Sequence, residues 1–198
     1  MFWRSPAWDA VTYVALDLET SGLRPRFDEI IAVATVPIRA GVIHYGERFY
    51  SLVRPPDLAS LPADGIGAHH ILPSELADAP GLGELLPAID ERLREGVLLL
   101  HFSHLDLGFL KDAYKRSRRE WPKPRVVDTV KLLLELSHRQ QRFTPHPVPP
   151  RTALPVARLE LGLPPYRHHH ALSDALATAE LFLALRARLG ARTLRELS

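Results

Sequence analysis

The sequence contains no cysteine and no long run of apolar residues. Without cysteine there can be no disulfide, no thiolate zinc site and no cysteine nucleophile, which excludes three kinds of chemistry. The apolar runs, such as 97–100 and 132–134, are far shorter than the roughly 20 residues that span a bilayer. We therefore expect no membrane-spanning segment. Residues 1–19 reach acidic side chains too early for a signal peptide, so we expect a cytoplasmic protein.

An excess of charge of one sign is also missing. The 25 basic and 23 acidic residues leave a net charge of +2, and this balance does not by itself indicate a nucleic-acid-binding protein. Hydrophobic residues make up 46% of the 198 residues and charged residues 24%, which are globular proportions. We expect a single domain over 1–198 with its core at about 11–189. A proline-rich loop is expected at 143–155, which carries five of the 18 prolines.

The apolar patterns predict a sheet with helices on its faces. Three β-branched and apolar stretches have the pattern of a β-meander, at 11–18, 30–38 and 42–53. Beyond them, strands at 97–102 and 125–127 alternate with helices at 85–93, 105–114, 130–136 and 171–189. This order predicts an α/β protein with a mixed five-stranded sheet, in which three antiparallel strands precede alternating helix and strand.

Two carboxylates stand at the end of the first predicted strand. Asp17 and Glu19 are separated by one residue, so a strand places both side chains on the same face. Such a pair can simply be two solvated residues at a strand end. If the pair is desolvated, its repulsion needs a compensating cation, and oxygen ligands favour a hard ion such as Mg²⁺ or Mn²⁺. The pair alone leaves both interpretations open.

Other polar residues favour a metal site. Asp106 follows the predicted strand 97–102 and opens a helix, and Asp174 lies among apolar residues early in helix 171–189. An acid in such surroundings is costly unless it is paired or bound to a metal. His169 precedes Asp174 by five residues, and a histidine can take a proton from water near neutral pH. Acids from three elements plus a histidine would suit phosphoryl hydrolysis with two metal ions.

Three segments carry a resemblance to a known family. Residues 17–22 (DLETSG), 101–110 (HFSHLDLGFL) and 169–175 (HHALSDA) resemble, in order and spacing, the three motifs of the DnaQ-like, or DEDDh, 3′–5′ exonucleases. That family includes the proofreading subunit of DNA polymerase III and ribonuclease T. The likeness runs from about residue 11 to residue 189. The sequence departs from the common family pattern at Ala32, Phe102 and Leu105, but none of these departures removes an expected metal ligand.

The resemblance implies a ribonuclease-H-like fold and an enzyme that uses two divalent ions, Mg²⁺ or Mn²⁺. By position, the catalytic ion would be bound by Asp17, Glu19 and Asp174. Asp17 would also serve the second ion, Asp106 would complete the acidic set, and His169 would be the general base. The implied activity is 3′–5′ hydrolysis of single-stranded DNA or RNA to nucleoside monophosphates. The residues expected at the terminal nucleotide are Leu18, Thr20, His69 and Ile71.

Several alternatives remain open at this level. The same fold can serve a non-catalytic module that binds nucleic acid or protein, although no expected metal ligand is missing here. The motifs do not distinguish DNA from RNA, nor a free enzyme from one that works beside a DNA polymerase or another replication or repair protein. Arg24, Arg26 and the basic run 111–125 are either phosphate contacts or solvated residues. His168 and His170 are expected to be surface or packing residues.

Overall fold

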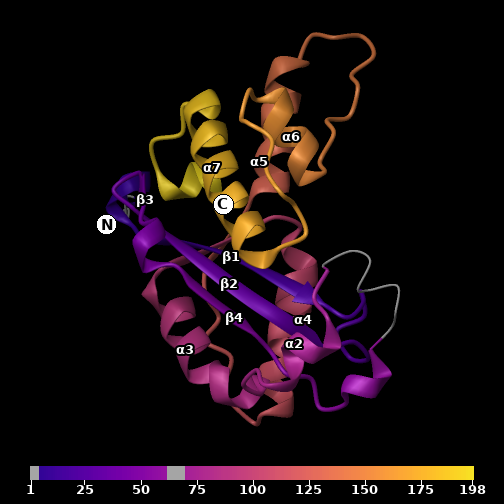
Figure 1. The fold of residues 1–198 in the computed structure, drawn as a ribbon. Coiled ribbons are helices and arrows are strands. Elements are labelled where there is room, and N and C mark those ends of the chain that lie inside the picture. The colour runs from indigo at the N-terminus through magenta and orange to yellow at the C-terminus, as the bar shows by residue number, and fades with distance from the viewer. Residues whose placement is uncertain (1–4, 62–69) are drawn as a thin grey trace.

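The computed structural model describes residues 5–61 and 70–198 and has an α/β fold (Figure 1). The strands of its sheet are β1 (Tyr13–Thr20), β2 (Ile30–Arg39), β3 (Val42–Ile43), β4 (Phe49–Leu52), β5 (Val97–Leu100) and β6 (Val126–Asp128). Its α-helices are α2 (Pro73–Ala77), α3 (Leu82–Glu95), α4 (Ser103–Arg116), α5 (Thr129–Gln140), α6 (Leu154–Glu160) and α7 (Ala171–Leu189).

The sheet combines an antiparallel and a parallel part. Its strand order is β3-β2-β1-β5-β6, with β4 also paired to β2. β2 runs antiparallel to β1, β3 and β4, whereas β5 runs parallel to both β1 and β6. The predicted fold class, a mixed sheet in which a meander precedes alternating helix and strand, is confirmed.

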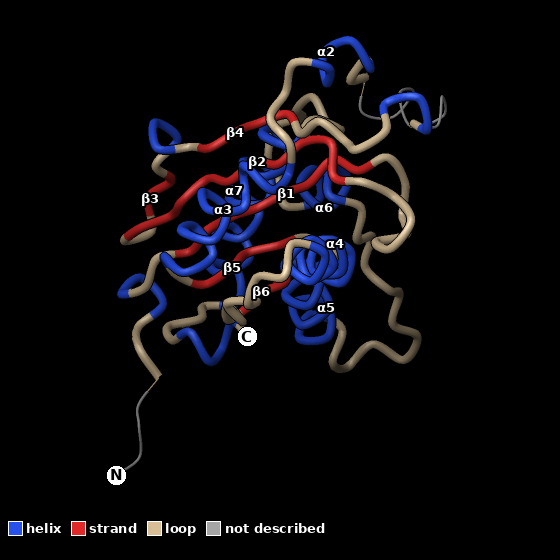
Figure 2. Tube along the Cα trace, turned by 90° about the horizontal axis from the view of Figure 1, so that it is seen from below, coloured by secondary structure: helices blue, strands red, loops and turns tan. Residues whose placement is uncertain are grey.

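The predicted number of strands is corrected from five to six. The stretch 42–53 was expected to form one strand, but β3 and β4 are separate and both lie along β2 (Figure 2). A 3₁₀ turn at Tyr45–Glu47 separates them. Gly46 lies at the centre of this turn, and a glycine inside an apolar stretch weakens a strand because it costs entropy and offers no side chain to pack.

Alternate residues of β1 serve two different cores. Tyr13 and Ala15 pack with residues of α5, α6 and α7, whereas Leu16 packs with residues of α3 and α4. These two groups of helices lie on opposite sides of the sheet (Figure 1). Because side chains alternate along a strand, Asp17 and Glu19 fall on the face that α7 covers.

β1 is paired on both sides over only part of its length. It pairs with β2 from Tyr13 to Thr20, but with β5 only at Tyr13–Ala15. The first four residues of β1 are buried and the last four are partly exposed. The strand therefore leaves the interior of the sheet at the point where its acidic residues begin.

The second half of the chain follows its predicted pattern with one addition. α7 has the predicted bounds and ends at Gly190, whose left-handed backbone (φ 64°) caps it. The unpredicted helix α6 begins inside the expected proline-rich loop, with a proline in its first turn. In the described part of the chain, no helix combines the length and apolarity needed to cross a membrane.

Candidate active site

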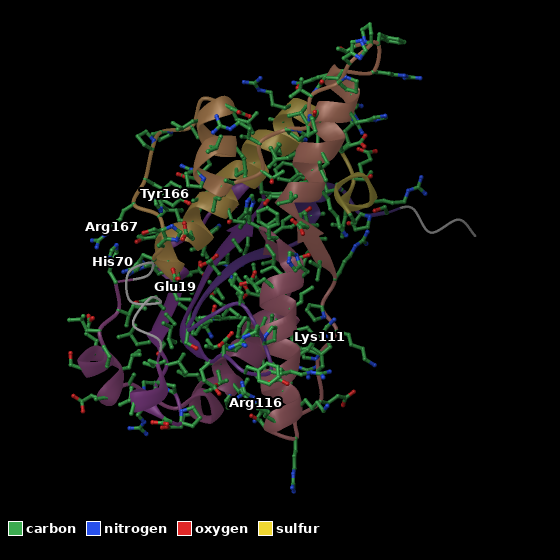
Figure 3. All side chains as sticks on the ribbon, turned by 90° about the vertical axis from the view of Figure 1, so that its right-hand side faces the viewer. Glu19, His70, Lys111, Arg116, Tyr166 and Arg167 are labelled. Atoms are coloured by element: carbon green, nitrogen blue, oxygen red, sulfur yellow. The ribbon has the colours of Figure 1, made fainter. Side chains whose placement is uncertain are left out.

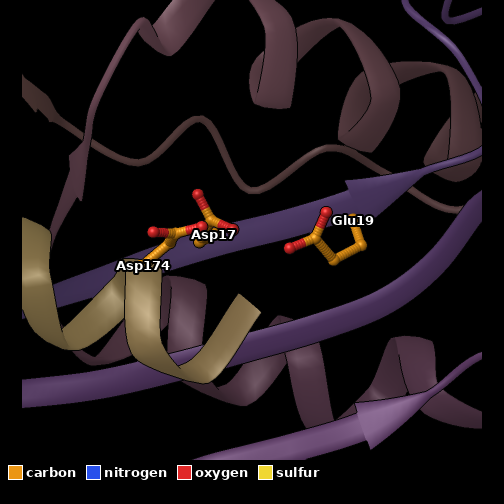
Figure 4. Close-up of side chains that lie close together, drawn as sticks. All are labelled: Asp17, Glu19 and Asp174. Carbon is orange, nitrogen blue, oxygen red and sulfur yellow. The ribbon is translucent and has the colours of Figure 1, made fainter. Parts of the chain in front are cut away.

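Three carboxylates meet where β1 passes the start of α7. Asp17 and Glu19 come from the partly exposed half of β1, and Asp174 lies in the first turn of α7. One carboxylate oxygen from each lies within 4.8 Å of the other two (Figure 4). Asp174 is buried and the other two are half-buried. Two distant parts of the sequence thus supply one acidic centre.

The surroundings of this centre oppose its negative charge. Burial, followed by the charges of Asp106, Asp174 and Glu19, raises the pKa of Asp17 well above its ordinary value. Burial, followed by the charges of Asp174 and Asp106, raises the pKa of Glu19 to about 8. Glu19 Oε1 is buried and has no hydrogen-bond partner among the described residues. The set of ligands therefore fits a hard divalent cation, which would neutralise these acids and take up the unpartnered oxygen.

Asp106 lies beside this centre without belonging to the group that meets within 4.8 Å. It is buried in the first turn of α4. This helix begins directly after Phe102, whose backbone is left-handed (φ 59°). Burial raises the pKa of Asp106 to about 7, although hydrogen bonding from its own backbone and that of Leu18 lowers it. The charge of Asp106 in turn contributes to the raised pKa of Asp17, so the two carboxylates repel each other.

Asp174 is held by hydrogen bonds to both of its carboxylate oxygens. Tyr166 Oη donates to Oδ1 at 2.5 Å, and the backbone N–H of His169 donates to Oδ2 at 2.9 Å. His169 reaches this position with a left-handed backbone (φ 60°). The two bonds fix the direction in which Asp174 presents its remaining lone pairs.

Sequence reasoning missed Tyr166, and no motif points to it. Its ring lies against the guanidinium of Arg158, 4.9 Å from the ring centroid. Arg158 is itself buried and donates to the backbone oxygen of Ala177 at 2.9 Å, and its guanidinium also lies 2.7 Å from the carboxylate of Glu180. α6 therefore carries a cation that orients the loop leading to α7. Figure 3 labels Tyr166 and Glu19 on the ribbon.

The three adjacent histidines have different environments. The side chains of His168 and His169 are exposed, and their rings meet edge to face at 4.4 Å. His170 is the N-cap residue of α7, and its ring stacks on Tyr50 of β4 at 5.0 Å. His170 therefore packs against the sheet, whereas the ring of His169 is free to turn toward solvent or a ligand.

The residues expected at the terminal nucleotide are spread over different environments. Leu18 packs against the core shared with α3 and α4, and the Thr20 hydroxyl donates to the backbone oxygen of Gly22 at 2.7 Å. Ile71 is only 7% exposed and packs beneath α7 with Ala171 and other residues. His69 lies outside the described residues. Substrate contact by these four residues stays a prediction.

The centre can perform one type of chemistry particularly well. Clustered carboxylates can hold divalent ions, which activate water and stabilise the charge that develops on a phosphate during its hydrolysis. A neighbouring histidine can accept the proton of the attacking water. The geometry thus agrees with the expectation of a phosphodiester hydrolase, drawn from the residues alone.

Comparisons with known proteins point the same way. A family model described as "Exonuclease" (RNase_T) matches residues 14–182. The chain is 31% identical over 173 residues to a DNA polymerase III PolC-type protein of Thermotoga maritima, covering 87% of this chain and 12% of that protein. It is 34% identical over 187 residues to a DNA polymerase III subunit epsilon-like protein of Rhodobacter capsulatus, covering 94% and 25%. The chain thus spans only a small part of the length of these relatives.

Solved structures share the fold at low sequence identity. A zinc-bound complex of E. coli ExoI with ssDNA superposes with a TM-score of 0.76 at 17% identity, covering 90% of this chain and 41% of that one. Exonuclease X in complex with 5′ overhanging duplex DNA gives a TM-score of 0.66 at 21% identity, covering 93% and 96%. The predicted ribonuclease-H-like fold is confirmed by this likeness.

Proposed function

The chain belongs to the RNase_T exonuclease family, and from this premise we propose that it is a metal-dependent 3′–5′ exonuclease acting on single-stranded nucleic acid. Nuclease function follows from the family. Polarity, strand type and metal use are the proposal. The acidic centre of Asp17, Glu19 and Asp174 is the observation that carries metal use, and the likeness to exonucleases supports polarity and strand type. The described chain acts, in this proposal, as one exonuclease domain that releases nucleoside monophosphates.

Each residue of the centre has a role in this proposal. Asp17, Glu19 and Asp174 hold one Mg²⁺ or Mn²⁺, and Asp17 with Asp106 holds a second. When bound, such ions lower the pKa of water and neutralise charge at the scissile phosphate. His169 takes the proton of the attacking water, because its backbone N–H binds Asp174 and its ring is exposed. Leu18, Thr20, His69 and Ile71 position the terminal nucleotide.

Partners and location extend the proposal. The related structure of ExoI is described as a complex with ssDNA, which supports single-stranded nucleic acid as the substrate class. The relatives named for DNA polymerase III support a polymerase, or another replication or repair protein, as a partner. We retain the cytoplasm as the expected location.

A nuclease panel tests the proposal directly. Purified protein is given 5′-labelled single-stranded DNA and RNA in Mg²⁺, Mn²⁺ or EDTA, with Asp17→Asn as the control. We expect shortening from the 3′ end with either metal, none in EDTA, and slow reaction when the 3′ end carries a phosphate. Full activity in EDTA would overturn the metal mechanism, and equal cleavage of circular strands would overturn the 3′-end assignment.

The alternative is a binding module without hydrolysis. It predicts that labelled strands bind but stay intact in every metal tested. The geometry favours the enzyme, because a binding surface for phosphates has no use for clustered acids whose pKa values are raised by burial and by mutual repulsion. Intact substrate after long incubation with Mn²⁺ would favour the module.

A further inference from the structure

A basic groove lies between α4 and the loop that follows β1, and none of the site assignments uses it. Loop 23–27 and the α4 residues Gly108, Lys111, Asp112 and Lys115 line a hollow of about 600 Å³, which we call the loop–helix groove. It carries four cations, from Arg24 and Arg26 on the loop and Lys111 and Lys115 on the helix, against one acid, Asp112. A chain with a net charge of only +2 therefore concentrates positive charge at this place.

Most of this charge is not neutralised within the protein. No ion pair within 4.0 Å is found among the described residues for Arg26, Lys111 or Lys115, and all three are exposed. The single acid of the groove, Asp112, forms an ion pair with Arg116, with 2.9 Å between Oδ2 and Nε. Arg116 itself does not line the groove. The groove therefore presents free cations to a ligand.

An aromatic ring lies among these cations. Phe27 is 76% exposed, and the guanidinium of Arg24 sits 5.4 Å from its ring centroid. Cations along a groove together with an accessible aromatic ring are the combination that binds single-stranded nucleic acid, with phosphates on the cations and a base on the ring.

The loop that carries half of the groove is held in place. Asp28 is buried, and its carboxylate accepts the backbone N–H of Arg24 at 2.7 Å. A side chain at Gly22 would collide with that carboxylate at 2.6 Å, and one at Gly108 would meet the Pro25 ring at 2.8 Å. These two glycines let the loop close on Asp28 and rest directly on α4.

The two elements that form the groove are continuous with elements that carry the acids of the proposed chemistry. The loop directly follows β1, which bears Asp17 and Glu19, and α4 bears Asp106 in its first turn. At 1.5 Å per residue, Lys111 lies about 7 Å and Lys115 about 13 Å along the helix from Asp106. We propose that the loop–helix groove binds the backbone of the substrate strand upstream of its 3′ end, with Phe27 stacking on one base. This assignment rests on the proposed exonuclease function.

Binding without catalysis tests the groove independently. In the Asp17→Asn background, a labelled single strand of about 12 nucleotides, within the usual site sizes of such grooves, is titrated at several salt concentrations. Lys111→Gln with Lys115→Gln should weaken binding roughly tenfold and reduce the slope of log affinity against log salt by about 1.4, or 0.7 per lost phosphate contact. Lys131→Gln, which removes an exposed charge on α5, should change neither.

Phe27→Ala separates stacking from charge. It should weaken binding about tenfold while the salt slope stays as it was, because one stacked base and no phosphate contact is lost. A wild-type salt slope in the double lysine variant, or an equal loss in Lys131→Gln, would overturn the groove. Tighter binding of a blunt duplex, lost equally in the lysine variants, would overturn the single-stranded occupant.

A hydrolysis experiment on proteins that keep Asp17 tells whether the groove assignment is wrong or the proposed exonuclease function is wrong. The ratio of kcat/KM for the long strand to that for a dinucleotide should fall in the double lysine variant, mainly through KM, and hold in Lys131→Gln. If the double lysine variant hydrolyses both substrates with an unaltered ratio of kcat/KM, the groove assignment is rejected and the exonuclease function is kept. If neither substrate is hydrolysed, the exonuclease function is rejected. The binding experiment then still decides whether the groove binds a single strand.

Discussion

The two ends of the β1–β2 pair treat their charges in opposite ways. At the end of β2, Arg39 is hydrogen-bonded to Glu47 at 2.6 Å and also to Glu95. At the other end of the pair, Asp17 and Glu19 meet Asp174 with no basic side chain in an ion pair among the described residues. One end has its acids matched by a cation, and the other gathers acids alone.

The pKa values express this difference. The hydrogen bond from Arg39 lowers the pKa of Glu47, whereas burial raises that of Glu19 to about 8. The Arg39 end is thus compensated within the chain. The acidic centre costs the folded protein free energy, which a bound cation or the uptake of protons can offset. Charge is therefore compensated at one end of these two strands and uncompensated at the other.

Replacing one acid should show this contrast most strongly. Asp17→Asn should lower nuclease activity by orders of magnitude, because Asp17 is proposed to hold both ions. The same change should keep or raise the melting temperature in EDTA, since a repelling carboxylate is removed. Activity and thermal unfolding are measured on the same preparation. A strongly destabilised Asp17→Asn would mean that the acid has a structural role.

The proposed general base is the next test. His169→Asn should cut turnover by about 10² to 10⁴, and asparagine tolerates the left-handed backbone at this position. The limb of the pH–rate profile that an imidazole contributes should disappear. His168→Ala should cost much less. His170→Ala should mainly lower stability, because its ring stacks on Tyr50. A nearly silent His169→Asn would reject the assignment.

Tyr166 tests how firmly Asp174 must be held. Tyr166→Phe removes the 2.5 Å hydrogen bond and keeps the ring on Arg158. Partners of metal ligands are typically worth about 10- to 100-fold in metal affinity or activity. We expect a loss in that range, visible as a higher Mg²⁺ requirement and as weaker Mn²⁺ binding by calorimetry. Wild-type Mn²⁺ affinity would show that the hydroxyl is dispensable.

The pH dependence of stability should differ with and without metal. The pKa of Glu19 rises from 4.5 to about 8 on folding and that of Asp106 from 3.8 to about 7, so the folded protein binds more protons than the unfolded chain between these values. Stability in EDTA should therefore fall as pH rises through this window. Mg²⁺ binds the deprotonated acids and should oppose the fall. Melting curves at several pH values, with and without Mg²⁺, measure both.

The compensated end should give the smallest effect. Arg39→Gln removes two ion pairs that are partly solvated, so we expect a loss of about 1 kcal/mol or less in the free energy of unfolding. Nuclease activity should not change, and the metal dependence of the melting temperature should also stay as in the wild type. Denaturant unfolding measures the difference. A large loss of activity would show that the two ends are coupled.

The sequence predicted the elements whose signals are local. The bounds of α7 and the acids of β1 were accessible because a helical or alternating pattern and a motif coincide there. The separation of β3 from β4 was missed because apolar residues precede and follow the short polar segment 44–48, which was taken into one strand. Tyr166 was missed because its partners, Arg158 and Asp174, meet only through tertiary packing. A loop residue without a periodic pattern gives no local sign of such contacts.

The one-sided pairing of β1 has a consequence for hydrogen exchange. Tyr13–Ala15 have strand neighbours on both sides, so their amides should exchange only when the whole sheet opens. Asp17–Thr20 pair with β2 alone, and opening that single ladder would relieve the crowding of their acids. Local opening should therefore be frequent without metal and rare once an ion ties β1 to α7. Slower exchange of the Asp17–Thr20 amides would then show that a metal ion is bound at the site.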